Sequence, residues 1–115
     1  MDVLAENVDS SGWTGSVDFS GTVTLTGRYR PHPEAPDVGA LCFYPDSVSA
    51  EQLPRFPNDQ RTSWFCFTNT DEAELSLGGP GREGEATIVI NEFNYLYQHT
   101  DTYNSARLQQ VLQRR

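Results

Sequence analysis

Two short apolar segments hold the chain's two cysteines, and in each the cysteine is followed directly by a phenylalanine. The first segment reads Leu-Cys-Phe-Tyr around Cys42, and the second reads Phe-Cys-Phe-Thr around Cys66. Side chains alternate between the two faces of a strand, so both thiols lie on the face opposite Phe43 and Phe67. Two such strands laid antiparallel bring the thiols onto one surface. We therefore predict a disulfide between Cys42 and Cys66.

Two other kinds of chemistry are open to these thiols. In a cytosolic protein they can remain reduced and pack as small hydrophobic side chains. A zinc site would need His32 and His99 as further ligands, but the chain has no Cys-x-x-Cys pair and no closely spaced histidines to preorganise it. We expect no metal and no other cofactor.

Aromatic side chains provide a second kind of chemistry, which is binding. If the cysteine face points outward, Tyr44 and Trp64 form an exposed patch beside the disulfide, suited to stacking on a sugar ring or anchoring a protein partner. If it points inward they are core, the fate we expect for most of the aromatic residues, because they bury large apolar areas. The candidate binding residues are these two and a ladder on a later strand: Tyr44, Trp64, Phe93, Tyr95 and Tyr97.

Catalytic motifs are absent from the sequence. His32 lies in a proline-flanked loop and His99 at a turn, and neither accompanies a Gly-x-Ser-x-Gly elbow or a His-Glu-x-x-His helix. The glycine-rich segment 78–84 lacks the Gly-Lys-Ser/Thr ending of a phosphate-binding loop. The acidic residues at 71–74 do not form a calcium-binding loop. We expect a protein that is not an enzyme.

The elements that would position these residues are mostly strands. Residues 17–30 alternate apolar and polar side chains, which predicts one long strand with Gly21 and Gly27 on its buried face, where they permit a bend. Asn91 and Glu92 mark a switch of the apolar face within a second long strand, so we expect a bulge there. The expected strands are 17–30, 39–44, 62–69, 85–98 and a closing strand at 105–113, which a helical stripe would also fit. Short helical turns are expected at 47–53, capped by Ser47 or Ser49, and at 70–75.

Five principal strands, two of them long and bent, predict an all-β protein with a small antiparallel barrel. On strand count and curvature alone, this barrel resembles the OB-fold. A β-sandwich is the alternative, although the spacing of Cys42, Trp64 and Cys66 does not match that of immunoglobulin domains. We expect a flexible lead-in over residues 1–15 and one domain over residues 16–115.

Charge and length narrow the range of partners. The net charge of this 115-residue chain is -8, and its eight basic residues are all arginine, which disfavours binding to a nucleic-acid backbone. The sequence has no apolar run long enough for a transmembrane segment and no signal-peptide pattern. A disulfide would place the protein in the periplasm or outside the cell, with a signal segment removed. Free thiols would indicate the cytoplasm.

Two functions fit these observations. The first is a non-catalytic extracytoplasmic module that docks a protein or glycan through its aromatic face or the rim of its loops. The second is an acidic cytosolic inhibitor or charge mimic that occupies a basic site on another protein. The sequence does not indicate the oligomeric state.

Overall fold

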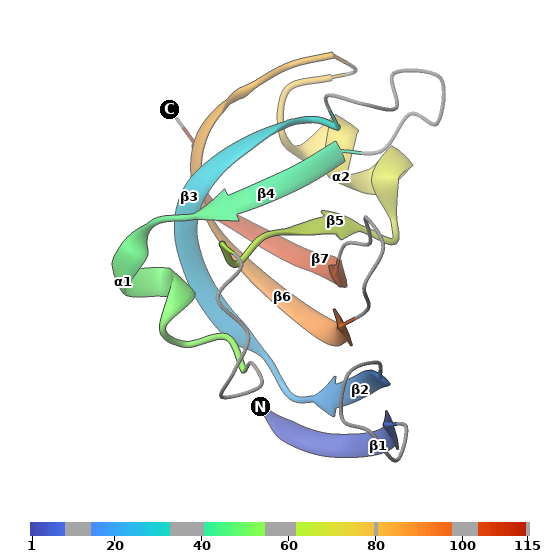
Figure 1. The fold of residues 1–115 in the computed structure, drawn as a ribbon. Coiled ribbons are helices and arrows are strands. Elements are labelled where there is room, and N and C mark those ends of the chain that lie inside the picture. Colours follow the sequence, from blue (N-terminus) through green and yellow to red (C-terminus); the bar gives the residue numbers. More distant parts are fainter. Residues whose placement is uncertain (9–14, 33–40, 55–61, 80, 98–103, 115) are drawn as a thin grey trace.

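The protein is a small all-β barrel, shown as a ribbon in Figure 1. The computed structural model describes residues 1–8, 15–32, 41–54, 62–79, 81–97 and 104–114. Over these residues the strands are β1 (Asp2–Val8), β2 (Gly15–Ser20), β3 (Val23–Pro31), β4 (Leu41–Pro45), β5 (Phe65–Phe67), β6 (Gly84–Tyr97) and β7 (Asn104–Arg114). Two short helices are present, α1 (Ser47–Ala50) and α2 (Thr70–Ser76).

Five strands close the barrel in the order β3, β4, β5, β7 and β6, with β6 returning to β3. The predicted five-stranded barrel is therefore confirmed, and the single closed sheet rules out the alternative of a sandwich. One pair differs from the expected antiparallel arrangement, because β5 runs parallel to β7. The chain runs from β5 through α2 and β6 before it reaches β7, a connection long enough for a parallel pair.

The long strand expected at residues 17–30 is two strands, β2 and β3. Its chain turns at Gly21, whose φ of 90° is a left-handed conformation that favours glycine. Before this turn, β2 pairs with the C-terminal end of β6, and after it, β3 pairs with the N-terminal half of β6. Gly27 remains in β3 and lies against β4, where a Cβ would come within 2.7 Å of Pro45 Cα.

The predicted switch of faces in β6 is confirmed. Ile88 and Ile90 are buried before the switch, and Phe93 and Tyr95 are buried after it. Glu92 has a φ of 50°, and the pairing with β7 shifts register between Asn91 and Asn94. This bulge lets β6 point apolar side chains to the interior on both sides of the switch, while β6 pairs with β3 before it and with β2 after it. The closing strand is also confirmed, as β7.

Part of the expected lead-in is ordered as a strand. β1 pairs antiparallel with β2 and forms the outer edge of the extension at the bottom of Figure 1. Its pairing rests on the backbone, because Val3 and Leu4 are exposed. A strand held in this way needs no alternation of apolar and polar side chains, so the sequence pattern did not predict it.

The two helices pack against the barrel strands. Ala73 and Leu77 of the α2 region are buried, and α2 contacts β4, β5 and β7. α1 is capped by Asp46, whose Oδ1 accepts a hydrogen bond of 2.8 Å from the Ser49 backbone N–H, rather than by either expected serine. Ser49 is buried instead, and its Oγ accepts a 2.8 Å hydrogen bond from the Thr26 backbone N–H of β3.

Candidate functional site

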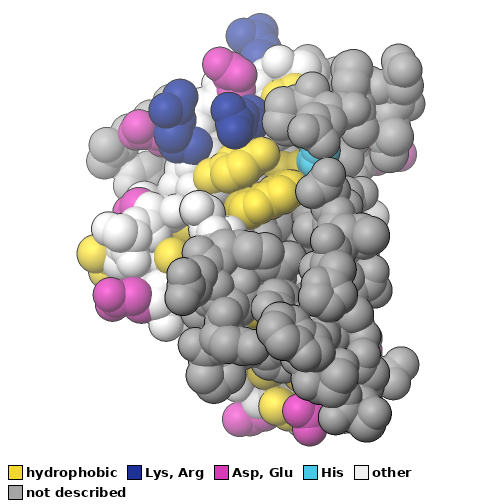
Figure 2. Space-filling model, viewed as in Figure 1, with side chains coloured by type: hydrophobic (Ala, Val, Ile, Leu, Met, Phe, Trp, Pro, Cys, Tyr) yellow, Lys and Arg dark blue, Asp and Glu magenta, His cyan; other side chains and the backbone are white. Residues whose placement is uncertain are grey.

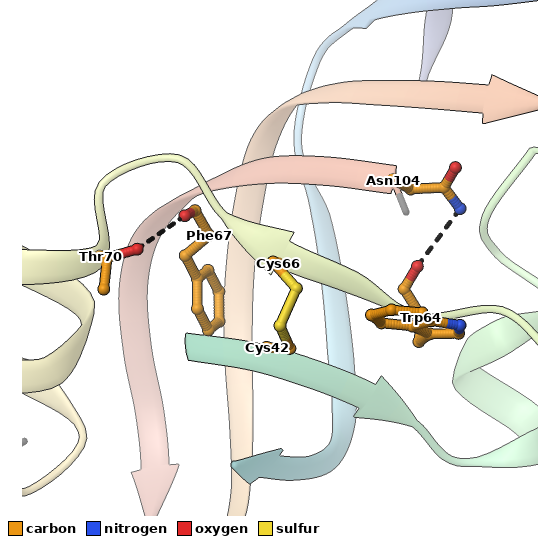
Figure 3. The surroundings of a disulfide bond; sticks show 6 residues. All are labelled: Cys42, Trp64, Cys66, Phe67, Thr70 and Asn104. Carbon is orange, nitrogen blue, oxygen red and sulfur yellow. Dashed lines mark hydrogen bonds between the residues drawn. A yellow bond between two sulfur atoms is a disulfide. The ribbon is translucent and has the colours of Figure 1, made fainter. Parts of the chain in front are cut away.

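A disulfide joins Cys42 and Cys66, as predicted. The two residues face each other directly in the antiparallel pair of β4 and β5. Phe43, Phe65 and Phe67 point to the opposite side and belong to the barrel core. The bridge therefore lies on the outer side of the barrel, yet Cys42 is 0% and Cys66 2% exposed. Both sides of these strands are closed to solvent at this point, and Figure 3 shows the bridge spanning them.

Tyr44 and Trp64 lie on the same outer side, next to the disulfide. Phe43 pairs with Phe65 in the antiparallel sheet. Tyr44, which follows Phe43, therefore lies opposite Trp64, which precedes Phe65. The two rings are stacked, with centroids 5.5 Å apart and planes inclined by 13°. Both residues are half-buried. The outward orientation considered from the sequence is therefore the one found.

Two side chains of the β3 region extend this pair. The Arg30 guanidinium carbon lies 4.4 Å from the centroid of the Tyr44 ring, within the range of a cation–π contact. The His32 ring lies 5.6 Å from that of Trp64. We call these four residues, Arg30, His32, Tyr44 and Trp64, the aromatic face. On the side of the molecule in Figure 2, a hydrophobic patch adjoins basic side chains above it and a histidine at its edge.

The backbone behind Trp64 is anchored by Asn104. The Asn104 Nδ2 donates a hydrogen bond of 3.2 Å to the Trp64 carbonyl, and its Oδ1 accepts one of 2.8 Å from the Leu96 backbone N–H. Asn104 is buried at the start of β7, so both of its polar ends are satisfied within the protein. Figure 3 shows this contact beside the disulfide. Trp64 lies just outside β5, and this hydrogen bond ties it to the sheet.

The other candidate binding residues do not join this face. Phe93 is 1% and Tyr95 3% exposed, because β6 turns that side toward the core after its bulge. This removes both from the candidate binding residues and makes them part of the barrel interior. Tyr97 ends β6, and its side chain lies outside the described residues, as does His99.

The disulfide also bears on the zinc site, because bridged sulfurs are not available as thiolate ligands. In the described ranges no group of three His, Cys, Asp or Glu side chains is placed to hold a metal ion. Of the acidic residues at 71–74, Glu72 accepts a 3.5 Å contact from Arg107 Nη2 at the surface.

Arg30 was not singled out from the sequence, and His32 was considered there only as a metal ligand or catalytic residue. In the sequence both residues alternate with Tyr29 and Pro31. Their position on the side of the chain opposite the core residue Tyr29 was therefore predictable. Their contact with the aromatic pair was not, because it depends on the pairing of β3 with β4. In that register Arg30 is opposite Cys42, and its guanidinium reaches Tyr44 diagonally.

This arrangement is suited to binding. Two stacked rings form an apolar cluster at the surface, a guanidinium and an imidazole beside them supply polar groups, and the disulfide stiffens the strands beneath. Among the described residues no helix is long and apolar enough to cross a membrane. Comparison of the chain with protein-family models, with curated proteins and with solved structures yields no match.

Proposed function

We propose that this protein is a non-catalytic binding module that docks a protein or glycan through the aromatic face. The observation that carries the proposal is the stacked, half-buried pair of Tyr44 and Trp64 on the outside of the barrel. Large aromatic side chains gain most by burial, so a rigid pair held at the surface is typical of a recognition site.

The order of the barrel strands adds support by analogy. Counted along the chain, β4 and β5 are the second and third strands of the barrel. In OB-fold barrels, the face of the second and third strands binds oligosaccharides and oligonucleotides. The aromatic face lies over this pair, and we propose that the barrel is OB-like in its use as well as in its strand count. The net charge of -8 favours a ligand without a phosphate backbone.

We further propose that the module works in an oxidising compartment, either the periplasm or the cell exterior. The Cys42–Cys66 disulfide supports this location, because structural disulfides persist in such compartments and are rare in the cytosol. Mass spectrometry of the protein from its native source, kept under non-reducing conditions, tests the location. The mass of the bridged form is expected, and a mass showing two free thiols would contradict the proposal.

Binding itself is tested with two probes, a printed oligosaccharide array and a library of displayed random peptides. The wild type is expected to retain members of at least one, and Trp64→Ala to lose them by about tenfold or more, as is typical of a central aromatic contact. Leu75→Ala is the matched control, because Leu75 is an exposed apolar residue on α2 and is 79% exposed. Circular dichroism checks that both variants are folded.

Three results decide the matter. Loss of retention in Trp64→Ala with retention in Leu75→Ala supports the aromatic face as the binding site. Equal retention by the wild type and Trp64→Ala places binding elsewhere and contradicts the proposal. A wild type that retains no member of either probe contradicts it as well.

A further inference from the structure

A groove of about 530 Å³ begins at Tyr44 and runs across the outer side of β3 and β6. Its volume is within the range of small-ligand sites. Most of its exposed lining is apolar and includes Gly27 and Ala86, which pair with each other in the sheet, while polar side chains stand along its walls. Both residues are buried and lie on the core side of their strands, in phase with Leu25 and Ile88, so neither projects a side chain into the groove.

Two rows of side chains line this groove, each crossing neighbouring strands. In the first row, Arg28 of β3 lies directly between Tyr44 of β4 and Glu85 of β6. This row continues past Tyr44 to Trp64, so the groove and the aromatic face form one surface. Neighbouring strands are about 4.8 Å apart, so the row presents an aromatic ring, a guanidinium and a carboxylate at close, regular spacing.

The second row lies two residues further along the strands. The Asp46 backbone N–H donates a 2.9 Å hydrogen bond to the Thr26 carbonyl, which sets these two residues side by side. Thr26 pairs with Thr87, and Thr87 with Gln113. The Thr26 and Thr87 hydroxyls lie 2.9 Å apart, and the Asp46 carboxylate is held by the Ser49 backbone N–H. Much of this row is therefore preorganised.

The mixture of groups indicates the chemistry of the ligand. Arg28 offers donors only, the carboxylates of Asp46 and Glu85 offer acceptors only, and the threonine hydroxyls and the amide of Gln113 offer both. Sugar hydroxyls also donate and accept, and neighbouring pairs of them match the two-point geometry of a guanidinium or carboxylate. An acidic ligand would meet two carboxylates here, and an apolar peptide side chain would leave these polar groups unpaired.

We infer that the ligand of this surface is a neutral oligosaccharide, with one pyranose ring bound in the groove against Tyr44 and the next over Trp64. The inference rests on the proposed function, because it uses the same aromatic face. It adds the class of ligand and a second set of contacts, centred on Arg28 and Glu85.

The test uses an array of neutral and acidic oligosaccharides, followed by calorimetry with the best-retained neutral tetrasaccharide. The isosteric change Glu85→Gln and the shorter, uncharged Arg28→Gln keep these exposed positions polar and should leave the fold intact. Each is expected to weaken tetrasaccharide binding by about tenfold or more, as for the loss of a charge-assisted hydrogen bond. Matched controls are Glu83→Gln and Arg82→Gln, exposed residues outside the groove lining, which should bind as the wild type does. Thermal melting verifies folding of all four variants.

The outcomes separate this inference from the proposed function. Tetrasaccharide binding that is weakened in both groove variants and unchanged in the controls supports the neutral-glycan groove. Binding that needs Trp64 but tolerates both groove variants overturns the groove and leaves the aromatic face as the site. Retention of only acidic glycans or only displayed peptides, again dependent on Trp64, overturns the neutral glycan. Binding that is independent of Trp64 and of the groove overturns both.

Discussion

Single residues decide how this barrel presents its aromatic side chains. Tyr44 and Tyr95 have the same chemistry, yet Tyr44 is half-buried on the outside and Tyr95 lies in the core. The difference arises from the side of the strand on which each falls relative to the barrel axis. That side is set by neighbours such as Phe43 and Phe93, which fill the interior. Residue type alone therefore does not identify the binding residues.

Gly27 is the residue at which a small substitution should cost most. An added Cβ would collide with the Tyr44 carbonyl oxygen and approach Pro45 Cα at 2.7 Å, and neither backbone atom can move without shifting β4. Gly27→Ala is expected to lower the free energy of unfolding by about 1–3 kcal/mol, the usual cost of overpacking. Urea denaturation measures this change. Thr24→Ala, at an exposed position of the same strand, is the control, and an equal effect of the two would refute the steric account.

Ser49 attaches α1 to the barrel through one buried hydrogen bond. Ser49→Ala removes the acceptor of the Thr26 backbone N–H, which loses a 2.8 Å hydrogen bond. The expected loss of stability is about 1–3 kcal/mol, because a partly buried donor remains unpaired. Ser47→Ala on the same helix is the matched control, since Ser47 is exposed and should tolerate the change. Chemical denaturation of both variants checks this, and an effect of Ser49→Ala no larger than that of Ser47→Ala would contradict it.

At the scale of elements, β4 and β5 depend on their covalent link. β5 has only three residues, and its pairing with β4 covers two residue pairs, so few hydrogen bonds join these two strands. The double variant Cys42→Ala/Cys66→Ala reopens a loop with a sequence separation of 24. In the chain-entropy model this should lower the free energy of unfolding by about 3.5 kcal/mol.

Urea unfolding of the oxidised wild type and of the double variant measures this contribution. Unfolding of the wild type in the presence of a reductant, which breaks the disulfide, serves as an internal control. The reduced wild type should be less stable than the oxidised one by a similar amount. A loss below about 1 kcal/mol in both comparisons would show that the disulfide is not what stabilises these strands.

The elements also show what a sequence pattern can predict. Alternation is local, so the shared parity of Cys42 and Cys66 was sufficient to predict the disulfide, and the parity switch at Glu92 was sufficient to predict the bulge. Pairing partners are not local. The parallel contact of β5 with β7 and the edge position of β1 depend on contacts between distant parts of the chain, which periodicity does not encode.

For the candidate site too, only the features that depend on local alternation could be predicted from the sequence. Tyr44, Trp64 and the disulfide follow from parity on two strands. The groove does not, because its rows join residues from β3, β4, β6 and β7 that only the closed barrel brings together. Arg28 and Glu85, for example, are 57 positions apart in the chain and directly opposite in the sheet.

For the whole molecule, net charge separates the proposed function from the acidic inhibitor. A charge of -8 directed at a basic partner would give binding that weakens steeply with salt, because screening acts on long-range attraction. Contacts of stacked rings and short hydrogen bonds with a neutral glycan depend little on ionic strength. We expect the affinity for the neutral tetrasaccharide to change by less than about threefold between low and high salt. Calorimetry at the two salt concentrations measures it, and a loss of tenfold or more would favour the charge-mimic function.

The most direct test of the aromatic face is an NMR titration of the nitrogen-15-labelled protein with the best-retained array ligand. The account predicts that the indole N–H signal of Trp64 shifts during the titration, together with backbone amides around Tyr44 and Arg30. Signals from α2 and β1, which carry exposed apolar residues outside the face, should stay in place. Shifts confined to α2 or β1, with an unchanged Trp64 indole signal, would contradict the central claim that the stacked pair is the binding site.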